Sequence, residues 1–525
     1  MVSEIRIQNL RSLRDTGFIK LKPINILVGV NSSGKSTFLR SFLLLAQSVT
    51  KRLRLPIAWF DDSLVDFGDF ETSKNRNAAD NENIVFSFRM QNVRLCRVPF
   101  PHRYNSRYDL PVQKEIPNME LSIYYGIKEN KDTHIKKIDI KFDTAEVELE
   151  LSNHSDCIRM RVDGREAESI LYNWQQGVDF GLLPMLRIES GSKITSGSLF
   201  ELPSMEKILA VLKNACGKRF SNVDRLQPII NMWDLDKEEF LKKIKLFDDI
   251  KSLRNRIVTW TVETPEFLRL YDGIMGLYLY EIWSSVNSEL GVYFENCDYV
   301  APLRAEARRY YRNQGLQVSR IDSYGRNLSE FIDSLTLAQR QSYNDYIGNM
   351  LGINIVVKNN TGHQTINLQK KGKKGKEYNI ADVGFGYSQI LPIVTKLWYV
   401  QERARFRSWG YFRQNTATSL IEQPELHLHP ALQAKLADAL MKATLMQDKS
   451  KFITNFIVET HSPTIINRMG RRVREGNIDA GNVNILIFDK DDESGDSKVW
   501  TTQFNEKGQI EKWPWGFFDP EDDDF

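Results

Sequence analysis

One stretch of the chain, residues 29–36, has the residue types and the spacing of a loop that binds phosphate. It reads Gly-Val-Asn-Ser-Ser-Gly-Lys-Ser and fits the pattern G-x-x-x-x-G-K-[ST] in full. In such a loop, backbone N–H groups and the positive end of the following helix hold the phosphates, Lys35 adds a charge, and the Ser36 hydroxyl binds Mg²⁺. The apolar run 24–28 predicts a strand before the loop, and residues 37–45 predict a helix after it. The sequence therefore predicts binding of a nucleoside triphosphate.

Two later apolar segments end in polar residues that suit the same site. Residues 419–421 lead into Glu422, and residues 452–458 lead towards His461. The helix-like stretch 430–445 separates them, and the order strand, helix, strand is typical of a parallel sheet. Ligands bind at the carboxyl edge of such a sheet, so we expect Glu422 to bind Mg²⁺ there and His461 to contact a γ-phosphate or position a water.

Composition restricts the classes of protein without identifying one. A chain of 525 residues exceeds the usual size of a single core, so we expect more than one lobe. Hydrophobic residues at 41%, charged residues at 26% and a net charge of +3 are ordinary for a soluble protein and do not indicate a nucleic-acid partner. The four cysteines form no C-x-x-C pair, which argues against a zinc ribbon or a disulfide framework. With no signal segment and no long apolar run, we expect a cytoplasmic protein without a membrane partner.

The pattern along the chain predicts an α/β fold in four parts. Residues 1–60 are expected to be the N-terminal part of a nucleotide-binding head, and residues 61–200 a β-rich lobe that continues it. Residues 201–295 have helical spacing and are expected to form an insertion. Residues 296–525 are expected to be the C-terminal part of the head. The head is therefore a mixed sheet assembled from both ends of the chain.

A lysine-rich segment, residues 370–376, contains five lysines. The strand-like flanks 353–357 and 365–368 predict a hairpin around it. The segment either contacts a phosphate backbone, which makes DNA one expected partner, or is a solvent-exposed turn.

Five stretches together resemble a known group of ATPases. The chain is similar to ABC-type bacterial ATPases of a single-chain group that includes the overcoming-lysogenisation-defect (OLD) ATPases and AAA-labelled proteins with a DUF3696-type C-terminal segment. The resemblance is carried by residues 7–12, 29–36, 382–389, 421–430 and 459–462. Residues 301–306 and 513–519 resemble the DUF3696-bearing branch more narrowly.

The resemblance implies an ATP site that two copies of the chain complete together. The segment 382–389 would close over the γ-phosphate bound by a partner copy, which makes ATP the link of a homodimer or a higher homo-oligomer. Two glycines in this segment allow a close backbone approach to an anion. The expected nucleotide contacts are Arg11, Ser12, Asn31, Gly34, Lys35, Ser36 and Thr37 in one copy and Gly384, Gly386 and Ser388 in the other; Ser36 and Glu422 are the expected ligands of Mg²⁺.

This chain departs from the family pattern where hydrolysis is concerned. ABC ATPases follow the magnesium-linked acid, here Glu422, with a glutamate that polarises the attacking water, and this chain has Gln423 there. A glutamine cannot accept a proton, so hydrolysis is expected to be slow, or Glu425 or His461 substitutes, or Gln423 orients the water itself. The segment 384–386, Gly-Phe-Gly, also differs from the usual Ser-Gly-Gly.

Three functions follow from this resemblance by analogy. The leading hypothesis is an ATPase that acts as the sensor or regulatory subunit of a bacterial anti-phage defence or DNA-maintenance system, with a separate effector such as a nuclease. The alternative is an OLD-like ATP-dependent nuclease in which Asp489 and Asp491 bind the metal. However, residues 492–497 are typical of an acidic turn into another strand, and few residues remain for a metal domain. A third hypothesis, an ABC transporter subunit, has no matching coupling surface.

Overall fold

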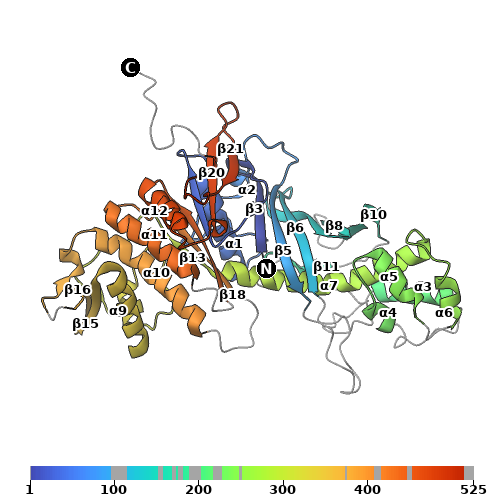
Figure 1. Ribbon diagram of the computed structural model, residues 1–525. Helices are drawn as coiled ribbons and strands as arrows, with labels where there is room; N and C mark the ends of the chain where they lie inside the picture. The colour runs from blue at the N-terminus through green and yellow to red at the C-terminus, as the bar shows by residue number, and fades with distance from the viewer. Residues whose placement is uncertain are drawn as a thin grey trace.

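The computed structural model describes residues 2–95, 115–151, 158–167, 173–175, 181–187, 203–216, 227–247, 251–372, 375–406, 415–445 and 452–512. At its centre lies a six-stranded sheet that takes strands from both ends of the chain (Figure 1). Five of the strands run parallel, and the last pairs antiparallel with its neighbour. In spatial order the strands are β13 (Cys297–Val300), β18 (Asn415–Glu422), β19 (Phe452–Glu459), β4 (Ile24–Gly29), β20 (Val483–Lys490) and β21 (Ser497–Thr502).

The central strand β4 is buried along its whole length, as expected for a parallel strand with layers on both faces. Its side chains alternate between two cores, because successive residues of a strand point to opposite faces. Leu27 packs into the core on one face, and Ile26 and Val28 pack into the core on the other. The strand therefore joins two layers that are otherwise far apart in the sequence.

The first layer contains a nine-stranded antiparallel sheet, helix α1 (Lys35–Thr50) and the long helix α7 (Pro265–Glu295). Phe42 of α1 and Phe88 of the antiparallel sheet both lie against Phe294 of α7. The strands are β10 (Arg165–Glu166), β9 (Ile158–Val162), β8 (Glu146–Leu151), β7 (Thr133–Phe142), β6 (Glu115–Ile127), β5 (Ile84–Arg94), β1 (Val2–Leu10) and β2 (Leu13–Asp15), with β3 (Ile19–Lys20) also paired to β1; the short helix α2 (Phe70–Ser73) and the two-stranded sheet of β11 (Asn173–Gln175) and β12 (Met185–Arg187) lie between these elements in sequence.

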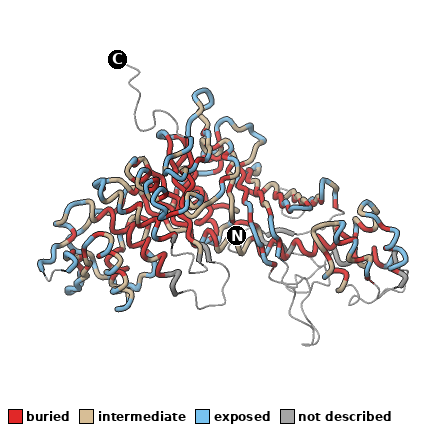
Figure 2. The backbone as a smooth tube through the Cα atoms, viewed as in Figure 1, coloured by how far each residue is buried: buried red, intermediate tan, exposed pale blue. Residues whose placement is uncertain are grey.

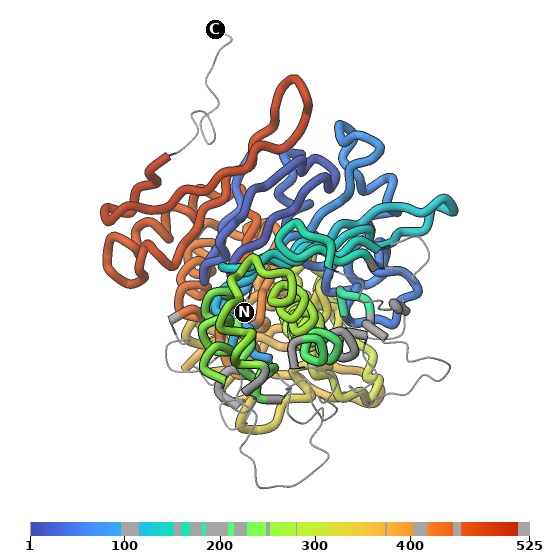
Figure 3. The backbone as a smooth tube through the Cα atoms, turned by 90° about the vertical axis from the view of Figure 1, so that its right-hand side faces the viewer, coloured from blue at the N-terminus to red at the C-terminus, as the bar shows by residue number. Residues whose placement is uncertain are grey.

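Helix α7 extends from the sheets into a separate group of helices (Figure 1; Figure 3 shows the same group from its end). Trp233 stacks on Tyr278 of α7 with ring centroids 4.3 Å apart, and Phe240 lies against Phe267 of α7. Aromatic pairs of this kind stabilise helix packing beyond the area that they bury. The group consists of α3 (Pro203–Cys216), α4 (Gln227–Asn231), α5 (Lys237–Lys245) and α6 (Lys251–Ile257).

The second layer lies on the other face of the central sheet and forms its own core (Figures 1 and 2). Its three main helices are α10 (Gly386–Phe406), α11 (Pro430–Leu445) and α12 (Pro463–Arg474). Beyond them lies a smaller unit made of α8 (Leu328–Asp333), α9 (Leu337–Leu351) and a sheet of β14 (Tyr311–Arg312), β16 (His363–Lys370), β15 (Ile353–Asn360) and β17 (Tyr378–Asn379); two short 3₁₀ helices span Ile380–Asp382 and Ala480–Asn482.

The structure confirms the expected α/β fold, with a mixed sheet assembled from both ends of the chain. One local prediction was right only in part. The two predicted strands pair with each other in residues 353–370, but through a turn at Thr361 and Gly362, where Asn360 pairs with His363. The lysine-rich segment follows this hairpin in sequence, between β16 and β17, which also pair antiparallel. Gly362 has a φ of 75°, which glycine adopts without strain, so it fits this tight turn. Residues 513–519 lie outside the described part of the chain.

Candidate functional site

The predicted phosphate-binding loop leaves the end of β4 and enters α1, as its sequence requires. Gly34 precedes the helix with a φ of 97°, and a Cβ added to it would lie 2.5 Å from Ser497 Oγ. A Cβ added to Gly29 would lie 1.9 Å from the carbonyl oxygen of Phe488 on β20. The two glycines of the pattern are therefore required because neighbouring strands lie against the loop.

Lys35 starts α1 and folds back over the loop. Its Nζ donates to the carbonyl oxygens of Gly29 at 2.9 Å and Val30 at 2.6 Å, and the residue is only 4% exposed. Burial lowers the pKa of this ammonium group. Of the other predicted loop contacts, Asn31 is exposed and Thr37 is half-buried. The loop thus holds a positive charge at the N-terminus of a helix, where an anion is favoured.

The hydroxyl of Ser36 is bound by a carboxylate from the C-terminal half of the chain. Ser36 Oγ donates to Glu459 Oε1 at 2.9 Å, and Glu459 is 3% exposed at the end of β19. Burial is the main cause that raises the pKa of Glu459 to about 7, and the neighbouring carboxylate of Glu422 adds to it. The sequence prediction assigned no role to Glu459.

Glu422, the predicted ligand of Mg²⁺, lies one strand further from the loop and is already paired. Arg40 of α1 donates from Nε and Nη2 to its two oxygens, both at 2.8 Å. The hydroxyl of Tyr299 on β13 also donates to Glu422 Oε1, at 3.0 Å. Glu422 and Glu459 are paired in register across β18 and β19, so the two carboxylates share one edge of the sheet.

The structure brings both predicted N-terminal residues to this edge. Ser12 Oγ and Ser497 Oγ lie 2.9 Å apart, beside Gly34. Arg11 lies over the ring of Phe67, 4.2 Å from its centroid, and burial followed by the nearby charge of Arg40 lowers its pKa. Together with Lys35, these two arginines give the loop a cationic surrounding that suits a polyphosphate.

The predicted catalytic residues Gln423, Glu425 and His461 also gather here, and Glu425 is fully engaged. One oxygen of Glu425 accepts from the backbone N–H of His461 at 2.7 Å, and the other accepts from Thr460 Oγ1 at 2.9 Å. Gln423 has a left-handed φ of 41°, and its N–H donates to the carbonyl of Glu459 at 2.8 Å. Burial lowers the pKa of His461, and the charge of Lys35 lowers it further. Both oxygens of Glu425 are thus occupied in holding the segment that carries His461.

The predicted trans segment lies at the N-terminus of α10, next to the loop that follows β18. Gly384 and Phe385 are exposed, whereas Ser388 is buried and donates to the carbonyl of Phe385 at 2.6 Å. The ring of Phe385 meets that of His427 edge-on, with centroids 5.1 Å apart. Among the described residues, Gly384, Gly386 and Ser388 make their hydrogen bonds and close contacts outside the phosphate loop of the same chain.

A buried arginine connects the trans segment to the site. Arg304 donates to the carbonyls of Gln423 and Leu426, each at 3.3 Å, and its own carbonyl accepts from Gln389 of α10 at 3.4 Å. It is 4% exposed, and burial lowers its pKa to about 10. Arg304 therefore holds the loop after β18 and the start of α10 in one arrangement.

The aspartates of the nuclease alternative lie in a hairpin between β20 and β21. Asp491 accepts from Ser494 within the turn and pairs with Lys498 at 2.6 Å, and Asp489 is opposite Lys498 in the register. In the described parts of the chain, no three or more His, Cys, Asp or Glu side chains gather so that they could hold a metal by themselves. The helices described there also include none that is both long and apolar enough to cross a membrane.

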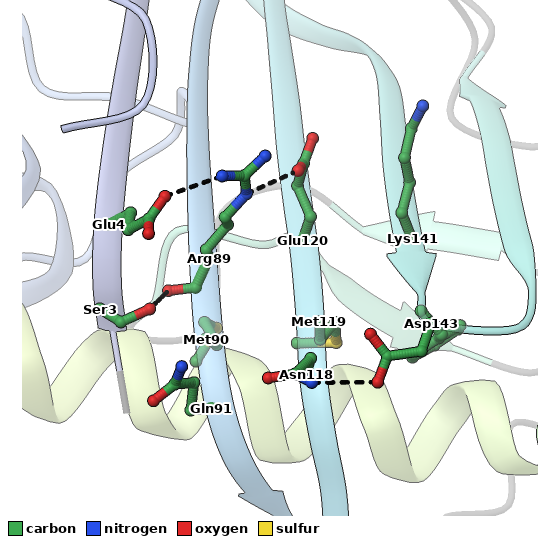
Figure 4. A pocket seen from close by; sticks show the side chains of 11 residues that line it. Ser3, Glu4, Arg89, Met90, Gln91, Asn118, Met119, Glu120, Lys141 and Asp143 are labelled. Carbon is green, nitrogen blue, oxygen red and sulfur yellow. Dashed lines mark hydrogen bonds and ion pairs between the residues drawn. The ribbon is translucent and has the colours of Figure 1, made fainter. Parts of the chain in front are cut away.

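A separate hollow of about 250 Å³ lies on the antiparallel sheet (Figure 4). Arg89 lies between Glu4 and Glu120, at 2.8 and 3.1 Å, and also covers the ring of Phe18. Its charge is balanced by two carboxylates, and the lining contains no histidine or cysteine. The phosphate loop therefore remains the better candidate for chemistry.

Three residues of the site were missed by sequence reasoning: Glu459, Arg40 and Tyr299. Glu459 ends an apolar strand just as Glu422 does, and this position is the signal that was available. Arg40 and Tyr299 lie within a helix and a short strand, and nothing in their local sequence indicates a contact with Glu422.

Among curated proteins none matches. Similar solved structures include an SMC head bound to the C-terminal winged-helix domain of ScpA, with 12% identity, coverage of 96% of this chain and 98% of that one, and a TM-score of 0.34. An SMC head domain from Thermotoga maritima has 8% identity, coverage of 95% and 98%, and a TM-score of 0.34. A Pyrococcus yayanosii Smc head domain with a coiled coil and joint has 12% identity, coverage of 97% and 98%, and a TM-score of 0.33.

Most of the chain matches the model of one protein family. The model of the AAA ATPase domain matches residues 1–173 and 298–466, which is more than half of the chain. The matched segments contain the phosphate loop, Glu422, Glu459 and His461, and they leave out the whole helical group of α3 to α7. The chain therefore belongs to the AAA ATPase domain family.

Proposed function

We propose that this ATPase binds Mg²⁺ and ATP at the loop of residues 29–36, that two copies join through the bound nucleotide, and that the pair regulates a separate effector in bacterial anti-phage defence or DNA maintenance. The observation that carries the nucleotide site is the hydrogen bond from Ser36 to Glu459. It joins the phosphate loop to a strand from the other end of the chain, at the edge where His461 also lies.

The residues present fit a nucleotide with its metal. Lys35 and the backbone N–H groups at the start of α1 suit phosphate, and Arg11 and Arg40 add positive charge nearby. Ser36 and the buried carboxylates of Glu459 and Glu422 suit Mg²⁺, which usually takes one or two carboxylates together with phosphate oxygens and waters. The metal, when bound, neutralises charge on the phosphates. The loop and Ser12 hold the nucleotide, and Glu425 holds the backbone of His461 in place.

Nucleotide binding is tested with the variant Lys35→Ala. We expect it to lower the affinity for a fluorescent ATP analogue at least about 100-fold, because it removes the charge that the loop holds at the phosphates. Lys22→Ala is the matched control, since Lys22 contacts the carbonyl of Val483 at the other end of the core strands. Unchanged binding in Lys35→Ala would contradict the site.

The pairing of two copies through ATP is supported by the exposed glycine segment at the start of α10. Its N–H groups suit an anion, and a negative charge placed there would repel a phosphate. We expect Gly386→Glu to abolish ATP-dependent dimerisation in light scattering while nucleotide binding by the single chain survives. Gly386→Ala is the control, because its Cβ would approach no closer than 3.5 Å to the carbonyl oxygen of His427. A dimer that persists in Gly386→Glu would refute the assignment.

The regulatory role is supported by the resemblance of the five sequence stretches and requires a cellular test. Cells that carry the chain with its neighbouring open reading frame are challenged with phages, and plaque numbers are compared with cells that carry Lys35→Ala. Protection that depends on Lys35 supports a defence role. Equal plaque numbers, with normal recovery from DNA damage in both strains, would remove both versions of the proposal.

A further inference from the structure

Glu459 places a carboxylate against the phosphate loop, and one of its two oxygens has no hydrogen-bond partner within the described residues. Oε1 accepts from Ser36, whereas Oε2 is buried and has no hydrogen-bond partner within the described residues. A buried carboxylate oxygen without a donor is costly and rare in folded proteins. A cation or a hydrogen-bond donor would satisfy this oxygen, and Ser36 and Lys35 of the phosphate loop both lie close to the carboxylate.

In Glu422, by contrast, both carboxylate oxygens accept hydrogen bonds. Arg40 engages both of its oxygens, and Tyr299 engages one of them a second time. Paired arginine and carboxylate groups with two parallel hydrogen bonds are among the stronger contacts in proteins. Glu422 would have to release this pair before it bound a metal.

The order of the strands explains the difference. In the sheet, β19 lies directly beside β4, and β18 lies one strand beyond it. Glu459 pairs in register with Leu27 of β4, two residues before the end of that strand, so its side chain reaches the loop. Glu422 pairs with Glu459 instead and is separated from β4 by the width of a strand.

We propose that Glu459, together with Ser36, is the protein's ligand for the Mg²⁺ that accompanies the nucleotide, while Glu422 stays paired with Arg40. This assignment rests on the proposed Mg²⁺–ATP site and replaces Glu422 within it. A hydroxyl and one carboxylate are sufficient, because Mg²⁺ completes its octahedron with phosphate oxygens and waters. The finding that no three His, Cys, Asp or Glu side chains gather among the described residues agrees with a site of this kind.

The test compares Glu459→Gln with Glu422→Gln in the full chain. A fluorescent ATP analogue is titrated in EDTA and in MgCl₂, and Mn²⁺ binding to the nucleotide complex is measured by electron paramagnetic resonance. We expect Glu459→Gln to weaken Mn²⁺ binding about 10- to 100-fold and to lose the gain in nucleotide affinity that Mg²⁺ gives, with binding in EDTA unchanged. Glu422→Gln should retain Mn²⁺ affinity within about threefold.

Normal Mn²⁺ affinity in Glu459→Gln, or the full loss in Glu422→Gln alone, overturns the assignment. If the unaltered chain binds no nucleotide in either buffer, the proposed function itself fails, and the assignment of Glu459 fails with it. If Glu459→Gln binds no nucleotide even in EDTA, its fold is in doubt, and Glu459→Asp takes its place, since it keeps the charge but shortens the reach. Glu459→Asp should lower Mn²⁺ affinity, and an unchanged affinity in that variant overturns the assignment equally.

Discussion

The ion pair of Arg40 and Glu422 allows a quantitative test of how firmly the second carboxylate is held. The side chain of Glu422 is 3% exposed and the side chain of Arg40 is 38% exposed. Removing one partner of a buried pair costs about 3–5 kcal/mol, and the partial exposure of Arg40 places Arg40→Met near the lower end, about 3 kcal/mol. Tyr299 continues to donate to Glu422 in that variant.

The pair is measured with a double-mutant cycle of Arg40→Met and Glu422→Gln. Arg40→Met leaves the buried carboxylate of Glu422 without its arginine, and Glu422→Gln leaves the half-buried Arg40 without its carboxylate, whereas the double variant leaves neither charge. The losses in the free energy of unfolding should therefore not add. We expect a coupling energy of about 2 kcal/mol, obtained from unfolding in urea.

A more exposed pair of arginine and glutamate provides the control. Nη2 of Arg14 donates to both oxygens of Glu82 at 2.7 and 2.8 Å, with both side chains more than a third exposed. A cycle of Arg14→Met and Glu82→Gln should give less than about 1 kcal/mol, because solvent screens exposed pairs. Additivity within about 0.5 kcal/mol at Arg40 and Glu422, equal to the more exposed pair, would refute the reasoning that Glu422 is committed to Arg40.

Three further predictions concern the packing around the site. Gly470→Ala should destabilise the protein by about 1–3 kcal/mol, because the added Cβ would lie 2.3 Å from the carbonyl oxygen of Gly508. Hydrogen exchange around Gly508 should become faster, and an unchanged melting temperature would contradict the prediction. Burial alone would raise the pKa of Asp438, but hydrogen bonds from two arginines of α12 lower it to about 2. The carboxylate therefore stabilises the fold by about 2 kcal/mol above pH 4 and loses this as the pH falls towards 2, so the stability difference between the protein and Asp438→Asn should be present at pH 7 and shrink in acid. Arg304→Met should weaken ATP-dependent dimerisation in light scattering while leaving nucleotide affinity within about threefold, since it releases the loop after β18 from α10, and full dimerisation would count against that link.

Sequence patterns predicted those elements around the phosphate loop that depend only on neighbouring residues in the chain. The loop of residues 29–36, the apolar strands that end at Glu422 and Glu459, and the helix that starts at Pro430 all follow from periodicity and glycine placement. Parallel strands bring their carboxyl ends to one edge, so the approach of Glu422 and His461 to the loop was predictable in outline.

The partners at that edge depend on the order of the strands, which the sequence does not state. Glu422 and Glu459 end two similar strands, and only the position of β19 next to β4 decides which one reaches Ser36. Arg40 faces Glu422 across a separation of 382 residues, and no local pattern predicts such a contact. The strand-like flanks 353–357 and 365–368 were expected to enclose the lysine-rich segment, whereas the shorter turn at Gly362 joins these two strands and the segment follows them, before β17.

The central strand β4 has a consequence for how the protein is made. Its neighbours β19 and β20 begin only at residues 452 and 483. At about 5–20 residues per second, a ribosome takes roughly 20–90 s to reach β19 after completing β4. The antiparallel sheet and α1 can cover the Leu27 side in the nascent chain, but Ile26 and Val28 must wait for helices that do not yet exist. Until β19 and β20 have been made, β4 is therefore an unpaired strand of the kind that can pair wrongly with other chains.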